Sequence, residues 1–536
     1  MIASVLGSLL QLQRGRRFAA FEQACKDPAT AQERVYAELH RRNGQTALAK
    51  RLGVDKAPTI AALRATVPLV SYEDLQPEID AMLRGEPAQL VSGRPLLFAT
   101  TSGTTGRTKY LPIDADYLKS FQEPMHLFLF RLLADHPQAT KHRVLYLVGS
   151  ADGPIAPCGV PTGTISGFNH RNLGPLLKGF HAVPYEPFVI ADPVARAYTV
   201  ARLALVHEVS LAVAITTHPL AELADVMEQH GEALIRDLHD GTLRSPAPMT
   251  DAERRLITPL LTAEPARAKV LEARLPLTPR RAWPDLALVS CWNHAGAGSH
   301  LAKVDAKWGP VPIRPALYSA TEGWLNVPTR DGEAGGILAV TSNVVEFEVL
   351  GPDGKPTGRT VLPNEVELGA SYGVVLCSGA GLWRYRLGDE VRVTGWFHKT
   401  PEIAFVQKLG SVLNLHHEAV REEQVRTAMD AVAARHGVSR WVVGPAAGGA
   451  LRYRFVIAAS APGERLAGDV DSELRKASLG YDEDRGSGLL EAPEVVLVAP
   501  DVFAAWERAR AARVGAQAKP VVLVTRSEEL PWEVTS

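Results

Sequence analysis

The sequence has few of the features that mark a secreted, membrane-spanning or metal-centred protein. Its four cysteines are far apart and include no Cys-x-x-Cys pair, so they predict reduced core thiols in a cytoplasmic protein. Its 16 histidines are scattered without metal-ligand spacing. No apolar run reaches the roughly 18 residues that a membrane-spanning helix requires. At the N-terminus the charges follow the short apolar run, and no cleavage site is present, which predicts an amphipathic helix and no signal peptide.

Net charge is also nearly absent. The 58 basic and 59 acidic residues give a formal charge of −1, which removes any general electrostatic attraction to nucleic acid or to an anionic membrane. We expect neither of these as a partner, and we expect a monomer. What the sequence does contain is a globular composition, with 46% hydrophobic and 22% charged residues. Its length of 536 residues predicts two or three domains.

The order of apolar patterns predicts an α/β protein. Helical spacing dominates the first 65 residues, and helices then alternate with short apolar strands, which predicts parallel pairing. From Gly335, short strands separated by turn signals predict an antiparallel subdomain, and a loop at 395–401 leads into a last strand–helix pattern. We predict a large N-terminal domain of residues 1–394 with a β-barrel-like subdomain at about 335–394, and a smaller mobile α+β domain of residues 395–536.

The most informative stretch is residues 98–113, FATTSGTTGRTKYLPI. An apolar strand enters a run of small, hydroxylic and glycine residues that ends at Lys109, and a second apolar strand follows. Gly103 and Gly106 permit backbone conformations closed to other residues, and the N–H and hydroxyl groups of such a turn suit an anion. We interpret it as a phosphate-binding loop. It is not a Walker loop, because two residues separate Gly106 from Lys109 and Pro112 argues against a helix. The alternative is a surface turn.

Two further stretches place polar side chains after predicted strands. In Tyr318–Glu322 (YSATE), Glu322 is suited to bind Mg²⁺ through its oxygen atoms, and Tyr318 is suited to stack on a base. In Tyr385–Asp389 (YRLGD), Asp389 is suited to accept two ribose hydroxyl groups, as acidic residues do in dinucleotide folds. The alternatives are an ordinary polar turn and an aspartate in a β-turn.

Together, and in this order, the three stretches resemble the motifs of adenylate-forming enzymes. Residues 101–109 resemble their phosphate loop, Tyr318–Glu322 their Y-x-x-(S/T)-E motif, and Tyr385–Asp389 their Y-R-x-G-D motif. Short stretches elsewhere in the chain are similar to the GH3 family of acyl-acid amido synthetases, which is named after auxin-responsive plant proteins. The chain is identified as a bacterial member. The similar pieces span nearly the whole chain: 67–74 (VPLVSYED), 164–167 (TISG), 283–286 (WPDL), 345–347 (VEF), 389–396 (DEVRVTGW) and 514–520 (VGAQAKP).

The resemblance implies a two-step reaction. A small carboxylic acid attacks the α-phosphate of ATP in the presence of Mg²⁺, which gives an acyl-adenylate and pyrophosphate. An amine, usually an amino acid, then displaces AMP and forms an amide. Phosphoryl charge must be neutralised during the first step, here by loop N–H groups, Ser102, Thr104 and the metal. The C-terminal domain is expected to swing between the steps and to exclude water.

The resemblance also assigns roles to residues. It implies that Glu322 binds the metal, Asp389 the ribose and Tyr318 the adenine. The rest of the implied nucleotide site is Thr101, Ser102, Gly103, Thr104, Thr105, Gly106, Lys109, Ser319, Thr321 and Lys408. Ser319 stands where Gly or Ala commonly follows the tyrosine. The implied catalytic residues are Lys519, Glu322 and Ser102. The expected acid-binding residues are Arg131, Thr164 and Phe168, from a predicted helix at 117–134 and a loop at 162–170.

One departure concerns the C-terminal domain. Relatives carry a lysine there that contacts the nucleotide phosphate, and Ala419 stands at that position, although Glu418 and Glu422 keep a family-like spacing. We expect Lys519, Lys408 or the His416–His417 pair to replace it, with Lys519 favoured because it lies in the matching C-terminal stretch.

Two alternative functions stay open. An acyl-CoA ligase would use a thiol as the acceptor, and the sequence offers no evident basic patch for the CoA phosphates in the C-terminal domain. A binding protein that no longer catalyses is suggested by Ala419.

Overall fold

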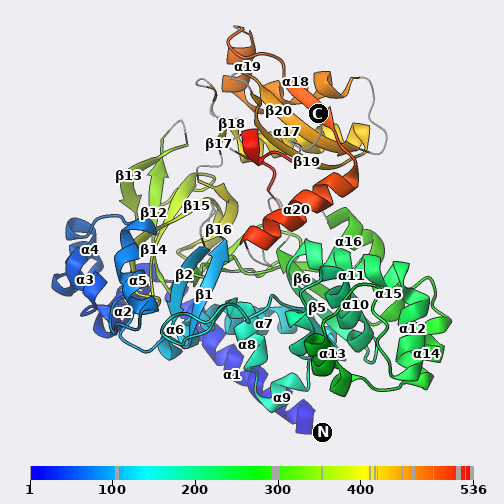
Figure 1. Cartoon of the computed structure of the whole chain (residues 1–536). Coiled ribbons are helices and arrows are strands. Elements are labelled where there is room, and N and C mark those ends of the chain that lie inside the picture. The colour runs from blue at the N-terminus through cyan, green and yellow to red at the C-terminus, as the bar shows by residue number, and fades with distance from the viewer. Residues whose placement is uncertain are drawn as a thin grey trace.

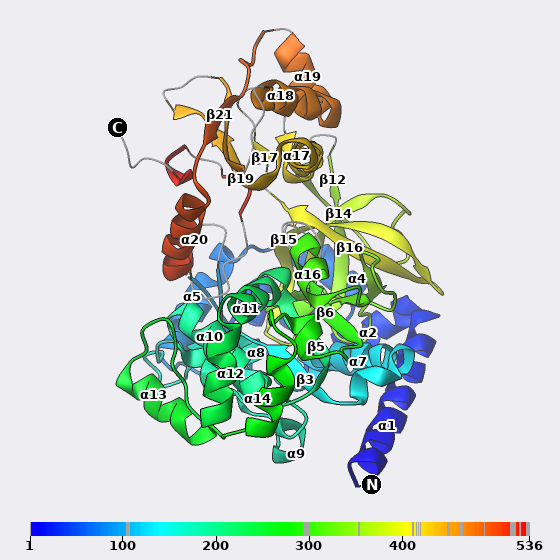
Figure 2. The ribbon, with the colours of Figure 1, turned by 90° about the vertical axis from the view of Figure 1, so that its right-hand side faces the viewer.

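The computed structural model describes residues 2–102, 108–292, 301–351, 354–409, 412–413, 415, 418, 420–447, 451–459, 465–486, 488–514, 521–524 and 527–531. A large body carries a smaller C-terminal lobe above it (Figure 1). Helix α20 (Pro500–Val514) leaves the lobe and runs down toward the body, as both views show (Figure 2). The predicted combination of a large N-terminal and a smaller C-terminal domain is confirmed.

The first half of the chain contains the predicted parallel sheet. Its four strands have the order β3-β5-β6-β7, and each neighbouring pair is parallel. Parallel strands are buried on both faces, and the core here includes the fully buried rings of Trp283 and Trp308. The strands are β3 (Arg143–Leu147), β5 (Val209–Thr216), β6 (Leu288–Trp292) and β7 (Ile313–Pro315). The helices around them are α8 (Ile165–Arg171), α9 (Pro175–Lys178), α10 (Pro193–Ala204), α11 (Thr217–Gln229), α12 (Gly231–Asp240), α13 (Asp251–Ile257), α14 (Pro265–Glu272), α15 (Pro279–Ala282) and α16 (Leu301–Trp308).

The helix expected over residues 117–134 is two helices, α6 (Ala115–Phe121) and α7 (Glu123–Asp135). The break at Gln122 follows from Pro124, which lies at the start of α7. Proline has no backbone N–H and is tolerated in the first turn of a helix but not in its interior. A continuous apolar pattern therefore concealed a helix boundary that proline chemistry imposes.

The second half of the body is an antiparallel sheet of seven strands in the order β10-β11-β16-β15-β14-β12-β13. The strands are β10 (Asn326–Val327), β11 (Gly336–Leu338), β12 (Val344–Leu350), β13 (Pro356–Val361), β14 (Ser371–Ser378), β15 (Leu382–Phe397) and β16 (Thr400–Lys408). The expected boundary between residues 394 and 395 falls inside β15, and the expected loop at 395–401 is the turn between β15 and β16, which pair along their length. We therefore propose that the N-terminal domain extends to Lys408.

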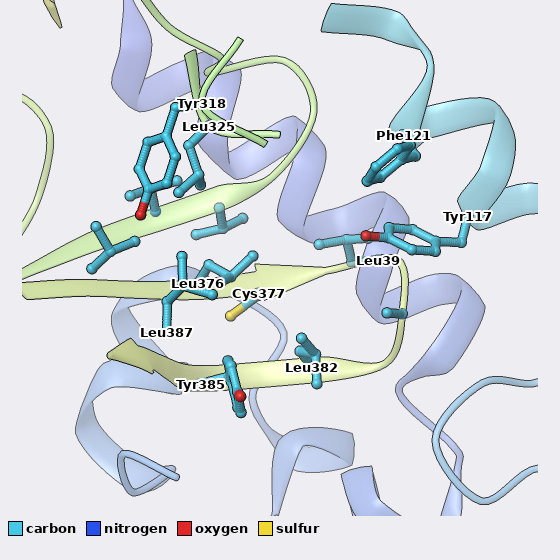
Figure 3. Packing of buried hydrophobic residues seen from close by; sticks show 14 of the residues in the cluster. Leu39, Tyr117, Phe121, Tyr318, Leu325, Leu376, Cys377, Leu382, Tyr385 and Leu387 are labelled. Atoms are coloured by element: carbon cyan, nitrogen blue, oxygen red, sulfur yellow. The ribbon is translucent and has the colours of Figure 1, made fainter. Parts of the chain in front are cut away.

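The N-terminal helices pack on this sheet. Buried Gln32 donates to the carbonyl oxygens of Val340 and Asn343 and accepts from the N–H of Val345. The side-chain amide of Gln32 thus serves as the hydrogen-bond partner of backbone groups at one end of β12. The helices are α1 (Ile2–Cys25), α2 (Pro28–Asn43), α3 (Ala47–Leu52), α4 (Ile60–Thr66) and α5 (Gln76–Leu83). Figure 3 shows the shared core, with Leu39 of α2 and Tyr117 of α6 beside Leu376 and Tyr385 of the sheet.

The predicted phosphate loop is the turn of a β-hairpin. Strands β1 (Leu97–Ser102) and β2 (Thr108–Ile113) are antiparallel, and Thr101 is paired with Lys109. This confirms the two apolar strands that flank the loop, whereas Gly103, Thr104, Thr105 and Gly106 lie outside the described residues. Strand β4 (Thr162–Gly163) pairs with β1 in parallel, so Gly163 lies beside Ala99.

The C-terminal lobe is a separate α+β unit. Its three-stranded sheet has the order β19-β20-β21 and packs against helices through a core of its own. Its elements are β17 (Val412–Leu413), β18 (Val420–Arg421), α17 (Glu422–His436), β19 (Val438–Pro445), β20 (Tyr453–Ala459), α18 (Leu466–Ala477), α19 (Leu479–Gly486), β21 (Glu494–Leu497) and α20. Within the described part of the chain, no helix is long and apolar enough to cross a bilayer.

Candidate active site

A cleft of about 2440 Å³ is lined by the body and by the C-terminal lobe. Residues from all three predicted motifs line it: Thr100 and Lys109 beside the loop, residues 318–322, and residues 386–389. Lys408 at the end of β16 lines the same cleft. Lys109 and Tyr318 are more than 200 residues apart in the sequence, yet both line this cleft. The predicted motifs therefore meet at one site.

Asp389 is the most constrained acidic side chain of the cleft. It lies on β15 opposite Lys408 on β16, and the Lys408 ammonium group forms an ion pair with Oδ1 of Asp389. The hydroxyl group of Tyr318 donates to Oδ2 of Asp389 at 2.5 Å. Asp389 retains 3% of its accessible surface. Both oxygens are therefore held by protein groups, and each keeps a further lone pair for a ligand hydroxyl.

Lys408 is charged in this setting. Burial alone would lower the pKa of its ammonium group, but the nearby carboxylates of Asp389 and Glu322 outweigh this and raise the pKa above its usual value. Its side chain keeps 37% of its surface exposed. A cation thus lies beside the carboxylate that the sequence assigned to ribose.

The ring of Tyr318 is packed within the protein. Its centroid lies 5.8 Å from that of Trp292 and 5.6 Å from that of Phe405, and the residue is 3% exposed. Burial, followed by the charge of Asp389, holds the pKa of Tyr318 well above its usual value, so its hydroxyl group stays a donor. Tyr318 lines the cleft and contacts two neighbouring rings and Asp389, and its role as an adenine platform stays a prediction.

Glu322 lies in the turn of a short antiparallel hairpin, between β8 (Ser319–Ala320) and β9 (Gly323–Trp324). The residue is 7% exposed, and the Tyr385 hydroxyl group donates to its Oε1 at 3.4 Å. One residue earlier, the carbonyl oxygen of Thr321 accepts from the Tyr117 hydroxyl group at 2.7 Å. Two tyrosines from α6 and β15 thereby fix the backbone and side chain of this motif. Tyr117 was missed as a site residue because its apolar pattern resembles a core position.

The loop hairpin is anchored by Tyr72. The hydroxyl group of Tyr72 accepts from the N–H of Tyr110 at 2.7 Å, and the Lys109 ammonium group lies 4.9 Å from the Tyr72 ring centroid. Burial raises the pKa of Tyr72 to about 12. Lys109 and Tyr72 both line the cleft. The backbone of Thr101 and Ser102 belongs to β1, whereas their side chains lie outside the described part.

The predicted acid-binding residues separate into two groups. Thr164 lines the cleft and caps α8, since its Oγ1 accepts from the N–H of Gly167 at 3.1 Å. Phe168 packs against both hydrophobic cores of the body. Arg131 pairs with Asp135 at 2.8 Å and lies over the ring of Phe18, on the face of α7 that meets α1. The structure therefore brings Thr164 to the cleft and turns Arg131 away from it.

The C-terminal lobe contributes cations that were not predicted. Arg440 on β19 and Arg508 and Arg510 on α20 line the cleft, and Arg440 forms an ion pair with Glu507. These arginines come from a strand and a helix that are far apart in the sequence, and the expected lack of a basic patch for CoA phosphates stays a prediction. Lys519, His416, His417 and Ala419 lie outside the described residues.

Comparisons with known proteins identify the chain. Three domains of the GH3 family match it: the N-terminal domain over residues 17–313, the central domain over 336–408 and the C-terminal domain over 423–528. The chain belongs to the GH3 family.

Relatives in this family are named for different acid substrates. Indole-3-acetic acid-amido synthetase GH3.8 of Oryza sativa subsp. indica is 26% identical over 437 residues, which are 76% of this chain and 71% of that protein. Jasmonoyl–L-amino acid synthetase JAR6 of Nicotiana attenuata is 26% identical over 441 residues, 77% of this chain and 75% of that protein. The solved structure of GH3.15 acyl acid amido synthetase aligns with a TM-score of 0.83 and 18% identity, covering 96% of this chain and 94% of that one, so the two share a fold.

Proposed function

We propose that this protein is an ATP-dependent acyl-acid amido synthetase. It activates a carboxylic acid as an acyl-adenylate and transfers the acyl group to an amine, most simply an amino acid. Family membership and the activities for which its relatives are named support the reaction class. The observation that carries the proposal for this chain is the meeting of Lys109, Glu322 and Asp389 around one cleft.

In the proposed site, ATP binds with its sugar at Asp389 and its phosphates toward the β1–β2 hairpin. Asp389 accepts from the ribose hydroxyl groups, and Tyr318 and Lys408 hold its carboxylate in place for them. Lys408, next to the ribose position, is suited to contact the α-phosphate, where charge must be neutralised as the acid attacks. We therefore propose Lys408 as a replacement for the lysine that relatives carry at the position of Ala419. The same role for Lys519 stays a prediction.

Glu322 fits a role in holding Mg²⁺. It is a mostly buried carboxylate in the cleft, and the Tyr385 hydroxyl group donates to it at a long 3.4 Å. Among the described residues, no group of three or more His, Cys, Asp or Glu side chains is arranged to hold a metal. This suits an ion that takes most of its ligands from water and from phosphate oxygens. Bound Mg²⁺ would neutralise phosphate charge during transfer.

The second step needs an unprotonated amine at the acyl carbon. The nitrogen lone pair forms the new C–N bond, the bond to the phosphate oxygen breaks, AMP leaves with that electron pair, and the amine loses a proton. Arg508 and Arg510 on α20 are suited to attract the carboxylate of an amino acid toward this end of the cleft. The C-terminal lobe, connected to the body after Lys408, is proposed to move between the steps and exclude water.

Three properties complete the proposal: a cytoplasmic setting, which the four unpaired cysteines support, a monomeric state, and small-molecule partners.

Acid-dependent exchange between ATP and labelled pyrophosphate tests the first step. The proposal expects exchange with at least one of a panel of aryl and aliphatic acids, and a protein that only binds nucleotide gives none. Incubation with amino acids or with CoA, followed by mass spectrometry, separates an amido synthetase from an acyl-CoA ligase.

A further inference from the structure

The cleft contains a polar group that the reaction does not use. His170 on α8 lines it and is 4% exposed, yet neither ring nitrogen has a hydrogen-bond partner among the described residues. The ring is held by aromatic neighbours, with centroids 5.0 Å from His181, 5.8 Å from Tyr146 and 5.8 Å from Phe188. A buried polar group without a partner costs free energy, so a well-packed imidazole in this state points to a partner that a ligand supplies.

The position of His170 relative to the reaction centre follows from α8. The helix starts directly after β4, whose Gly163 lies beside Ala99 on the loop-bearing strand β1. An α-helix rises about 1.5 Å per residue, so His170 lies about 9 Å along the axis from Thr164. An acid whose carboxylate reacts near the β1–β2 hairpin can therefore reach His170 with its opposite end.

The neighbouring imidazole ring, that of His181, has a defined tautomer. Nδ1 of His181 lies 2.9 Å from the carbonyl oxygen of Leu177, which can only accept, so Nδ1 carries the proton and Nε2 is an acceptor. Burial lowers the pKa of His170 to about 4 and also lowers the pKa of His181. Both rings are therefore neutral near pH 7, and neutral His170 offers one donor and one acceptor.

This combination selects a chemical class of ligand. A carboxylate would find no cation in these two rings, and an alkyl or unsubstituted aryl end would leave the His170 nitrogens unpaired. A hydroxyl group can accept from the protonated nitrogen of His170 and donate to Nε2 of His181, so it uses both of its hydrogen-bonding capacities here. The aromatic neighbours Tyr146 and Phe188 also line the cleft and provide apolar surface beside His170.

We propose that the acid substrate carries a hydroxyl group at the end remote from its carboxylate, and that His170 recognises this group. The inference rests on the proposed function, because it takes the reacting carboxylate to lie near the β1–β2 hairpin. His170 is then a specificity-determining residue of the acid pocket.

The test uses acids that differ by a single hydroxyl group. Phenylacetate, benzoate and cinnamate are compared with their ortho-, meta- and para-hydroxy derivatives by acid-dependent pyrophosphate release, as kcat/KM. The wild-type protein should favour one hydroxy isomer over its parent acid by about 10- to 100-fold, the range expected when a buried polar group gains or loses one hydrogen-bond partner. His170→Phe should abolish this preference while turnover of the parent acid persists. His170→Gln, which keeps a donor and an acceptor, should restore part of it.

Two outcomes would overturn the inference: no hydroxy isomer preferred by the wild type, or a preference that His170→Phe leaves unchanged. Both leave pyrophosphate release by the parent acids in place and so spare the proposed function. Absence of release with every acid tested contradicts the proposed function itself. If His170→Phe is unfolded by circular dichroism, His170→Leu and the wild-type isomer series decide the question.

Discussion

The hydroxyl group of Tyr318 donates a hydrogen bond of 2.5 Å to Oδ2 of Asp389, which joins residues of two motifs that lie 71 positions apart in the sequence. Because the opposite oxygen is held by Lys408 at the end of β16, the carboxylate is fixed between two donors, one on a strand and one just before β8. A group oriented in this way can recognise ribose without reorganising when the nucleotide arrives.

Tyr318→Phe should therefore raise the KM for ATP by about tenfold and lower the free energy of unfolding by about 1–3 kcal/mol, since one buried carboxylate oxygen loses its donor. Initial rates of pyrophosphate release against ATP concentration, together with urea unfolding, measure both effects.

Tyr372→Phe is the matched control for this change. Tyr372 is similarly buried on β14, and its hydroxyl group accepts from the N–H of Glu367 at 3.0 Å. It should lose stability while keeping its KM for ATP. Equal shifts of the KM for ATP in both variants would contradict a role for Tyr318 in the nucleotide site.

Lys408→Met should lower the rate of adenylation by about 10²-fold or more, in the range found when one transition-state donor is removed. The raised pKa of Lys408 also sets a sign for pH dependence. Its ion-pair contribution to stability is fully present below the ordinary lysine value of 10.5 and is lost as the pH rises through the higher folded value. Lys408 should stay protonated between pH 6 and 9. In this range the pH profiles of wild-type and Lys408→Met activity should therefore have the same shape.

Lys399→Met, at the exposed turn of the same β15–β16 hairpin, is the control and should retain wild-type exchange. Lys519→Ala should also depress adenylation if that residue shares the phosphate. A loss confined to amide formation would disprove the assignment for either lysine.

Glu322→Gln should raise the Mg²⁺ concentration needed for half-maximal exchange by about tenfold, because an anionic oxygen ligand is replaced by a neutral one. The residue is isosteric and Tyr385 can still donate to its carbonyl oxygen, so the melting temperature should change little. Titration with Mg²⁺ at saturating ATP measures the effect. An unchanged Mg²⁺ requirement would place the metal elsewhere.

Gly167→Ala should destabilise the body by about 1–3 kcal/mol, the usual cost of forcing an extra carbon into a packed region. A Cβ at this position would lie 2.2 Å from the carbonyl oxygen of Gly149, which is backbone and cannot move aside cheaply. Gly174→Ala, where a Cβ would meet nothing within 4 Å, should leave stability nearly unchanged. Similar melting temperatures for the two variants would contradict this packing argument.

Local chemistry in the sequence predicted the elements of the site more reliably than their partners. Two apolar strands around a glycine- and threonine-rich turn are readable as a hairpin, and Glu322 and Asp389 stand out after strands. The sequence did not predict that Lys408 lies opposite Asp389, because the register of β15 and β16 contains irregularities. A shift of one residue would have pointed one of these side chains to the other face.

Orientation around helices was the second source of error. Arg131 lies in the same apolar helix as cleft residues such as Met125 and Leu129, and sequence alone did not say which face each occupies. The ion pair with Asp135 turns it outward. The arginines of α20 were missed for the same reason, since their common target appears only when the C-terminal lobe is placed over the body.

The most direct measurement of the central claim is the product formed from ATP, a carboxylic acid and a mixture of amino acids. We predict AMP, pyrophosphate and an acyl–amino acid amide detected by mass spectrometry, in amounts that fall together in Asp389→Ala. Formation of an acyl-CoA but no amide when CoA is also supplied, or ATP binding without release of pyrophosphate for any acid, would contradict the account.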